Sequence, residues 1–305
     1  MLTAESHRQR GVALILALLL MALATVVAVA VASGEEFAIR RSSNVLLRTQ
    51  AREYLAAGEL LAAAQLRPLL ANTAAPTPVR AALAWPLDPP GTGELRDAQG
   101  CFNLNALSLP EGQTALAEQR LRRLLDLLDL PADIADQLLD WLDEDTTARF
   151  AGAEDDQYSR RRPPMRAANA PLGDVSELRL LPAVDARAYA ALAPLVCALP
   201  PQVPTNINAA PPLLLMALAD GLRPGQAREL AARTAARPYA SLDAFLADPA
   251  LTGVVLDASG LTVHSDWFTV HAQVRLDQLV LQRDSLLHVQ NGQPRVIRRH
   301  EQAGG

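Results

Sequence analysis

The sequence predicts an α+β fold, in which one long N-terminal helix packs on a small antiparallel sheet and a large all-α domain is inserted in the sheet region. Three observations support this prediction. A helical apolar pattern runs unbroken for about 55 residues from Val12. Strand patterns occur near residues 94–107 and return only from Leu261. Between them, at about residues 111–250, the apolar spacing is helical, so the early strands need partners from the end of the chain.

The composition excludes several classes of protein. The chain has 305 residues, of which 50% are hydrophobic and 20% charged, so neither a disordered chain nor a polytopic membrane protein fits. All 28 basic residues are arginines, which excludes Schiff-base lysines and the P-loop lysine. The net charge of -5 argues against a surface for bulk phosphate binding.

The first part of the long helix is predicted to span a membrane. Val12–Ser33 gives 22 residues without a charge, and a helix of that length spans roughly 33 Å. Arg8 and Arg10 precede this run and Glu35 follows it, so the positive-inside rule places the leader in the cytoplasm and the body on the other side. A secretory signal cleaved near Ala30 is the alternative, although the run is long for one.

The helical pattern continues beyond the apolar run. Apolar residues recur at spacings of three and four, which places them on one face: Leu47, Ala51, Tyr54, Leu55, Gly58, Leu61, Ala62, Leu66 and Leu69. The opposite face is predicted to carry Arg48, Arg52, Glu53 and Glu59. We expect this helix to pack on a domain and to end near Pro68 or in the turn-rich stretch that follows.

The strand patterns predict a short hairpin at 94–107 and a second sheet region at the C-terminus. Val270, Ala272 and Val274 alternate with polar residues, which is a period of two. Asn291-Gly292 between two such segments indicates a two-residue hairpin, and Pro294 is tolerable on an edge strand.

The helical segment between the strands carries two further signals. Its helices are predicted at Leu116–Leu128, Ile134–Leu142, Leu213–Leu222, Gln226–Arg237 and Leu242–Leu246. Two Asn-x-Asn-Ala units, at Asn103–Ala106 and Asn206–Ala209, repeat at its two junctions, and we expect them to brace turns rather than to bind a ligand. Residues 221–245 also resemble a helix-hairpin-helix unit, which is favoured as a packing module here.

Four features together resemble a secretion-system family. Gly11 before the apolar run resembles the leader of type IV pilins and type II secretion pseudopilins. Three stretches resemble the K subunit of the type II secretion pseudopilus: GCFNLNALS from Gly100, LLDWLDEDTTARFAGAEDDQY from Leu138 and TNINAAPPLLLMAL from Thr205. The resemblance covers nearly the whole chain. It implies a leader at 1–11, a transmembrane helix at 12–33, a periplasmic part of the helix at 34–75, a pseudopilin β-domain at 76–110 and 251–305, and an inserted α-helical domain at 111–250.

The resemblance implies an assembly role. A prepilin peptidase is expected to cut between Gly11 and Val12 and to methylate the new amine. Most pseudopilins carry a glutamate where this chain has Leu16, and the K subunit, which lacks it, caps the pseudopilus tip. We therefore expect a single-pass inner-membrane protein with its body in the periplasm, which binds the minor pseudopilins I and J, then the major pseudopilin. It is expected to help initiate pseudopilus assembly and protein export.

The sequence also leaves further partners and alternative functions to consider. Our hypothesis is that the insert contacts secreted substrate or the outer-membrane secretin, and we expect no binding of nucleic acid. A membrane-anchored periplasmic DNA-binding protein and a minor pilin of a type IV pilus remain alternatives. No enzyme is expected, because adjacent His264, Ser265 and Asp266 lack a nucleophile elbow and point to alternate faces of a strand.

The acidic residues after Leu142 leave two interpretations open on chemistry alone, a solvated loop or a cation site. Hard cations such as calcium need several oxygen ligands, and a helix end followed by a turn brings carboxylates together. The family resemblance implies calcium, with Asp143, Asp145, Glu154 and Asp155 as ligands. Asp156 is an alternative for one of them.

Two cysteines, Cys101 and Cys197, allow one disulfide, and their pairing depends on the compartment. The repeated asparagine units place one cysteine near each junction of the insert. Because a periplasmic body permits oxidation, we expect the two to pair.

Overall fold

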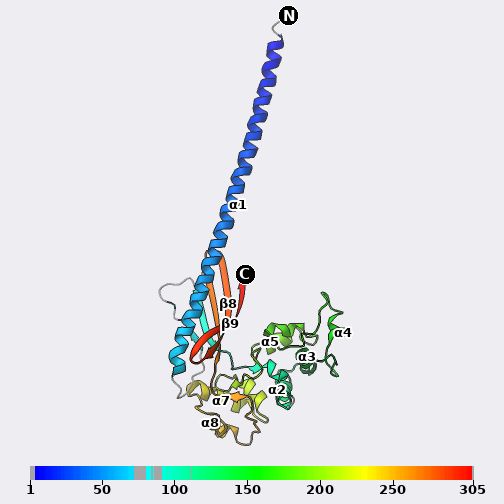
Figure 1. Cartoon of the computed structure of the whole chain (residues 1–305), viewed down its shortest axis with the longest axis vertical. Helices are drawn as coiled ribbons and strands as arrows, with labels where there is room; N and C mark the ends of the chain where they lie inside the picture. Colours follow the sequence, from blue (N-terminus) through cyan, green and yellow to red (C-terminus); the bar gives the residue numbers. More distant parts are fainter. Residues whose placement is uncertain (1–3, 72–79, 84, 86–90, 111, 304–305) are drawn as a thin grey trace.

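A computed structural model describes residues 4–71, 80–83, 85, 91–110 and 112–303 of the chain, without the side chains of residues 4–13, 31–38, 69, 71 and 303. A single long helix projects from a body that is built at its C-terminal end (Figure 1). The α-helices are α1 (Ala4–Ala71), α2 (Thr114–Leu127), α3 (Asp133–Leu142), α4 (Asp155–Tyr158), α5 (Ala186–Leu192), α6 (Pro212–Leu218), α7 (Pro224–Ala236) and α8 (Leu242–Leu246). Short 3₁₀ helices are η1 (Leu104–Ser108), η2 (Val175–Leu180) and η3 (Pro249–Leu251).

The strands form one larger sheet and two small ones. They are β1 (Arg80–Ala82), β2 (Gly91–Asp97), β3 (Phe102–Asn103), β4 (Val196–Cys197), β5 (Thr205–Asn206), β6 (Leu261–Thr262), β7 (Trp267–Leu276), β8 (Leu279–Gln290) and β9 (Gln293–Ala303). The larger sheet is antiparallel in the order β1-β2-β7-β8-β9, and the pairs β3-β4 and β5-β6 are parallel. The α+β class predicted from the sequence is therefore confirmed.

The C-terminal half of α1 packs on this sheet (Figure 1). Ala51, Leu55, Ala62 and Leu66 have no exposed surface and contribute to one core with apolar residues of β2, β7 and β8. This confirms the predicted apolar face, because these residues recur at helical spacing. The prediction for Glu59 is wrong: its side chain is 5% exposed and faces the sheet, where Ser285 and Arg299 donate hydrogen bonds to it.

The C-terminal hairpin forms as predicted. Asn291 and Gly292 connect β8 to β9 with φ values of 52° and 71°, which a two-residue turn of this kind requires. Gly292 adopts such a value without a steric penalty. Pro294 lies on β9, which is an edge strand, so its missing N–H removes no interior ladder bond.

The hairpin predicted at 94–107 does not form. β2 pairs with β1 and β7 instead, and the later segment, β3, pairs in parallel with β4. The side chain of Gln99 explains the departure of the chain from the sheet. Its Oε1 accepts hydrogen bonds from the backbone N–H groups of Asp266 and Trp267, and its Nε2 donates to the carbonyl of Pro204. The segment after β2 is thereby held by residues far along the chain rather than by a local turn.

The helical part of the body contains two units of similar plan. Each begins with an Asn-x-Asn segment on a short strand, β3 or β5, continues through helices, and returns on a parallel strand, β4 or β6. Both units share one hydrophobic core, which runs from Phe102 to Val263 and includes Leu121, Ile134 and Leu230. The unit with α7 and α8 lies beyond the end of α1, and the unit with α3, α4 and α5 extends to one side of the sheet (Figure 1).

A third, smaller cluster joins the sheet to the helical part. Trp267 of β7 and Leu286 of β8 pack there with Leu199, and the two cysteines lie against the cluster. The ring of His288 stacks on Trp267 with centroids 4.1 Å apart.

In the part of the chain that the structure describes, no helix carries an apolar stretch long enough to span a membrane.

Candidate metal centre

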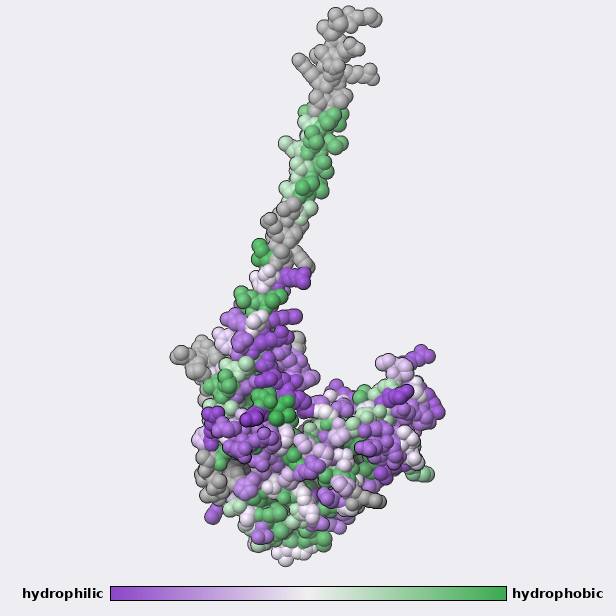
Figure 2. Space-filling view, in the orientation of Figure 1, coloured by the Kyte–Doolittle hydropathy of each residue, from purple (hydrophilic) through white to green (hydrophobic). Residues whose placement is uncertain are grey.

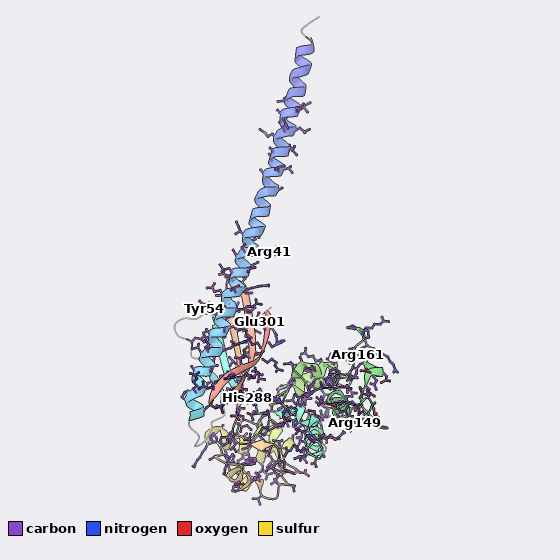
Figure 3. The ribbon with its side chains drawn as sticks, in the orientation of Figure 1. Arg41, Tyr54, Arg149, Arg161, His288 and Glu301 are labelled. Atoms are coloured by element: carbon purple, nitrogen blue, oxygen red, sulfur yellow. A yellow bond between two sulfur atoms is a disulfide. The ribbon has the colours of Figure 1, made fainter. Side chains whose placement is uncertain are left out.

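Two helix ends bring the acidic residues together. Ile134, Leu138 and Trp141 fix α3 in the helical core, so that Asp143 follows directly at its C-terminus. Glu154 precedes α4, whose Tyr158 is fully buried and packs edge-on against Trp141, with ring centroids 5.1 Å apart. This aromatic contact places the start of α4 beside the end of α3. Both elements lie on an arm of the body that also carries Arg149 and Arg161 (Figure 3).

Three of the four predicted ligands converge. One carboxylate oxygen from each of Asp143, Asp145 and Glu154 lies within 4.8 Å of the others. Asp155 lies outside this group, because its Oδ1 accepts a hydrogen bond from the N–H of Ala167 and its Oδ2 is 3.8 Å from Arg166. Asp156, the alternative ligand, instead pairs with Arg160 at 3.3 Å on the exposed side of α4.

Buried oxygens of two of the converging carboxylates lack hydrogen-bond partners among the described residues. Glu154 is only 4% exposed, and neither of its oxygens has a hydrogen-bond partner among the described residues. Oδ1 of Asp143 is likewise buried and without a partner there. Unpaired buried carboxylates are costly, since desolvation disfavours the charged form. A bound cation would supply the missing interactions.

The electrostatics of the group agree with this interpretation. Burial first, and then the nearby charges of Asp140 and Asp143, raise the pKa of Glu154 to about 7. Burial and the charges of Asp145 and Asp140 also raise the pKa of Asp143. Like charges that oppose one another's ionisation are typical of a site that binds a positive charge.

The chemistry of the donors fits calcium. The group offers carboxylate oxygens only, and hard cations prefer oxygen ligands. It contains no histidine or cysteine, which zinc would favour. Asp143, Asp145 and Glu154 are thus the residues that would hold a calcium ion, with further oxygens from the backbone or water.

Two residues of the acidic stretch that were not assigned as ligands, Asp140 and Gly152, shape the loop. Asp140 is fully buried, and its carboxylate accepts a hydrogen bond from the N–H of Arg149 at 3.1 Å. Gly152 lies against it so closely that a Cβ atom would be 1.8 Å from Asp140 Oδ2. Asp140 lies three residues before Asp143, on the buried face of α3.

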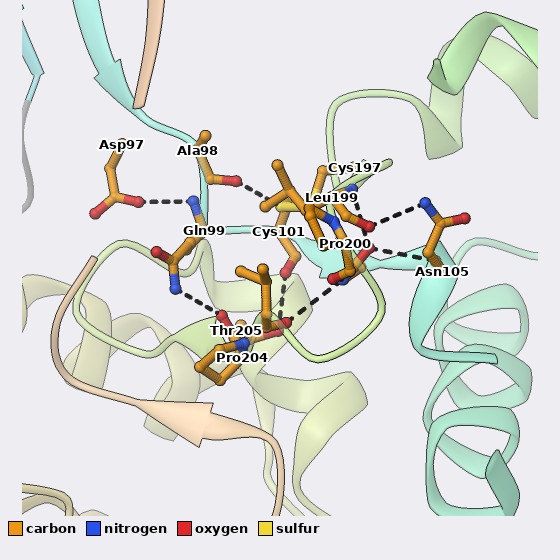
Figure 4. The surroundings of a disulfide bond; sticks show 12 residues. Asp97, Ala98, Gln99, Cys101, Asn105, Cys197, Leu199, Pro200, Pro204 and Thr205 are labelled. Atoms are coloured by element: carbon orange, nitrogen blue, oxygen red, sulfur yellow. Dashed lines mark hydrogen bonds between the residues drawn. A yellow bond between two sulfur atoms is a disulfide. The ribbon is translucent and has the colours of Figure 1, made fainter. Parts of the chain in front are cut away.

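The structure joins the two cysteines. Cys101 and Cys197 form a disulfide with a Cα–Cα distance of 5.8 Å, across a sequence separation of 96 residues (Figure 4). Cys101 follows the bend at Gln99 and Cys197 ends β4, so the bond lies where the first unit begins and ends. Thr205 at the start of the second unit donates a hydrogen bond to the carbonyl of Cys101 at 2.9 Å.

The repeated asparagines have the predicted bracing role. Asn105 exchanges hydrogen bonds with the backbone N–H and carbonyl of Leu172 and also donates to the carbonyl of Leu199. Asn208 does the same with Tyr239 and the carbonyl of Val263. The second asparagine of each unit therefore holds one mid-unit residue against the returning segment.

The predicted cleavage site lies near the free end of α1. Gly11 and Val12 are helical, and the side chain of Val12 lies outside the described part of the chain.

Comparisons with known proteins agree on one family. Two models of the family described as type II secretion system (T2SS), protein K, match residues 100–201 and 205–264, which correspond to the two helical units. The type II secretion system protein K of Klebsiella pneumoniae is 36% identical, over 96% of this chain and 97% of its own. That of Pseudomonas aeruginosa is 36% identical, over 97% of this chain and 94% of its own.

One solved structure extends the likeness to the fold. A chain in the crystal structure of the GspK-GspI-GspJ complex from the type 2 secretion system of enterotoxigenic Escherichia coli superposes with a TM-score of 0.72. It is 32% identical in sequence, and the match covers 87% of this chain and 99% of that one.

Proposed function

This chain belongs to the type II secretion system protein K family, and on that premise we propose that it is the minor pseudopilin that caps the tip of the type II secretion pseudopilus. In this role it helps to initiate pseudopilus assembly and supports protein export across the outer membrane. The function is organisational, and the family is one of secretion-system components rather than of enzymes.

The observation that carries the proposal is the position of the helical units. The second unit, with α7 and α8, lies beyond the C-terminal end of α1, and the first unit, with α3, α4 and α5, extends to one side (Figure 1). In a filament built from parallel N-terminal helices, the next subunit on the tip side needs the space above the body. A body that extends past the end of its own helix blocks that space by excluded volume, so this subunit ends the filament.

The N-terminal half of α1 supports both anchoring and polymer contacts. Its large apolar side chains from Leu14 to Val29 are 54–69% exposed, and they form a continuous hydrophobic surface (Figure 2). Such a surface is stable only against lipid or against other apolar helices. We place it in the inner membrane before assembly, with the body in the periplasm, and against neighbouring pseudopilin helices afterwards.

Leu16 fits the terminal position. An ionised glutamate at bilayer depth costs several kcal/mol unless an opposite charge neutralises it. A subunit that lies under another subunit gains such a charge from the neighbouring N-terminal amine, whereas a cap does not. An apolar side chain at position 16 needs no partner of this kind.

The partners follow from the related complex, which contains subunits named GspI and GspJ beside GspK. We propose the corresponding minor pseudopilins I and J as direct partners, and the major pseudopilin as the subunit that follows them. Prepilin peptidase would process the chain between Gly11 and Val12. The helical units would remain accessible to secreted substrate or to the secretin.

Calcium binding by Asp143, Asp145 and Glu154 is part of the proposal. When bound, the ion would supply positive charge to three carboxylates that otherwise repel one another. Asp143 and Glu154 belong to different helix ends, so an ion held by both would tie α3 to α4 and order the arm between them.

Labelling of pseudopili tests the capping role. Antibodies against the helical units are applied to pseudopili assembled with the full-length chain, and their positions are recorded by electron microscopy. We expect label at one end of each filament. Label at regular intervals along the shaft, with subunits on both sides, contradicts the proposal.

A second measurement tests processing. The intact mass and the N-terminal residue of the chain are determined from cells with and without prepilin peptidase. We expect a methylated Val12 at the N-terminus only in the presence of the peptidase. An unprocessed chain in both strains, or cleavage near Ala30, contradicts the assigned leader.

A further inference from the structure

A cavity of about 490 Å³ lies at the seam between the two helical units, away from the carboxylate group. Its walls combine η1 and α2 of the first unit, the connecting segment Pro201–Thr205, and the segment that leads into β6. Most of the lining is apolar, with Phe102, Leu116 and Val203 among its residues. Its volume is within the range of pockets that hold small ligands.

One cation lines this cavity. Arg120 on α2 is 6% exposed, and its Nη1 and Nη2 donate hydrogen bonds of 2.8 Å and 2.6 Å to the carbonyls of Ser259 and Asp257. These contacts hold the guanidinium in place at the seam. The Nε–H group is buried and has no acceptor among the described residues. Each terminal nitrogen also retains a second N–H group, because a guanidinium has more donors than these bonds use.

Within the described residues, Arg120 forms no ion pair. Its two acceptors are neutral carbonyl groups, and no carboxylate of the described residues lies within the 4.0 Å of a salt bridge. The carboxylate of Asp257 instead accepts a hydrogen bond from the N–H of Ser259. The neighbouring Arg123 adds a second positive charge to the region. Burial lowers the pKa of Arg120, and the charge of Asp257, beyond ion-pair distance, offsets this effect only in part. A bound anion at hydrogen-bond distance would therefore stabilise the buried guanidinium further.

We propose that this cavity is a binding site for a carboxylate attached to a short apolar group. The guanidinium of Arg120 would receive the carboxylate through its free N–H groups, and the apolar group would contact Phe102, Leu116 and Val203. The same chemistry is offered by a small organic acid and by the C-terminus of a polypeptide that ends in an apolar residue. Because the cavity lies between the two units, a bound ligand would favour the relative position of the units in which the site is formed.

Titration of the full-length chain in detergent micelles with matched probes tests the proposal. One pair is 4-phenylbutyrate and its amide, and the other is an acetylated tetrapeptide that ends in phenylalanine and its C-terminal amide. We expect one acid or both to bind about tenfold more tightly than the matched amide, since a charge-assisted hydrogen bond is lost in the amide. Whichever of the two acids binds more tightly identifies the source of the carboxylate, a small organic acid or the C-terminus of a polypeptide.

Variants separate the cavity from unspecific binding. Arg120→Gln removes the charge, and we expect it to abolish the difference between acid and amide. Arg123→Gln is the matched control, because Arg123 also donates to a carbonyl, that of Ala217, but does not line the cavity. Leu116→Trp reduces the volume of the cavity and keeps the Arg120 side chain. It tests the cavity independently if Arg120→Gln does not fold. We expect it to weaken binding of the acid about tenfold.

Three results would overturn the proposal. The first is equal binding of acid and amide by the unaltered chain, and the second is the absence of binding by both acids. The third is acid binding that Leu116→Trp leaves unchanged.

Discussion

The carboxylate of Glu59 on α1 accepts three hydrogen bonds from the guanidinium of Arg299 on β9: 2.7 Å from Nη2 to Oε2, 2.8 Å from Nε to Oε1 and 3.1 Å from Nε to Oε2. Ser285 on β8 donates a further hydrogen bond of 2.7 Å, and Arg283 lies 3.5 Å away. Glu59 is nearly buried, while Arg299 is half exposed. A polar network thus lies inside an otherwise apolar interface, and it fixes the register of the long helix on the last two strands.

Removal of Glu59 is expected to weaken this interface. Glu59→Ala leaves Ser285 and Arg299 without their acceptor and removes the ion pair with Arg283. We expect the free energy of unfolding to fall by about 2–4 kcal/mol. Glu53→Ala, an exposed glutamate on the same helix, is the matched control and should change it by less than about 0.5 kcal/mol. Denaturation of the full-length chain in detergent, followed by near-ultraviolet circular dichroism, measures both. Equal effects of the two variants would contradict the role assigned to Glu59.

The same network predicts a loss of stability in acid. Burial opposes ionisation of Glu59, but hydrogen bonds from Arg299 and Ser285 and the charges of Arg299 and Arg283 outweigh it, so its pKa lies below the ordinary 4.5. Below that value the unfolded chain binds more protons than the folded chain, so the free energy of unfolding falls as the pH falls. The free energy of unfolding of the unaltered chain and of Glu59→Gln is measured from pH 6 downward into the acid range. The difference between the two profiles gives the contribution of the Glu59 carboxylate, because the variant lacks it. Parallel pH profiles would argue against it.

Calcium is expected to stabilise the arm that carries α4. An ion bound only by the folded chain raises its free energy of unfolding by about 2.7 kcal/mol at one hundred times the dissociation constant. We expect the melting temperature of the full-length chain to rise when calcium exceeds the chelator, and Glu154→Gln to lose most of this rise. Asp156→Asn is the control, because Asp156 is exposed and pairs with Arg160. The absence of a calcium effect on the unaltered chain would eliminate the site.

Gly152 is expected to tolerate no side chain. In Gly152→Ala the new Cβ atom would overlap Asp140 Oδ2, so the loop or the buried carboxylate must move. Overpacking of this kind costs about 1–3 kcal/mol, and we expect a smaller calcium response as well. Gly225→Ala, where a Cβ atom meets nothing within 4 Å, should leave both thermal stability and the calcium response unchanged or slightly improved.

The disulfide is expected to stabilise the body. Cys101 and Cys197 close a loop of 96 residues, and in the chain-entropy model such a loop contributes roughly 4–5 kcal/mol. Cys101→Ser with Cys197→Ser should lower the free energy of unfolding by about this amount, and reduction of the unaltered chain should have a similar effect. A thiol assay should find no free cysteine in the purified protein. A count near two free thiols would show that the bond does not form in the cell.

The sequence was informative where the structure is local and periodic. The apolar face of α1 followed from spacings of three and four, and the β8–β9 hairpin followed from Asn291-Gly292, because both signals depend on residues a few positions apart. The acidic loop was recognised as one group by composition and resemblance. The grouping did not separate Asp143, Asp145 and Glu154, which converge, from Asp155, which binds the N–H of Ala167.

The sequence alone determined the class of fold, the apolar N-terminal run and the positions of the main helices, because periodicity and turn residues act over short distances. The tertiary structure alone decided the partners that come from far along the chain. It placed Glu59 against the sheet, although helical position suggested the solvated face, because Arg299 and Ser285 lie more than 200 residues away. It also directed the segment after β2 to β4 rather than into a hairpin, since the acceptor and donors for Gln99 come from distant segments.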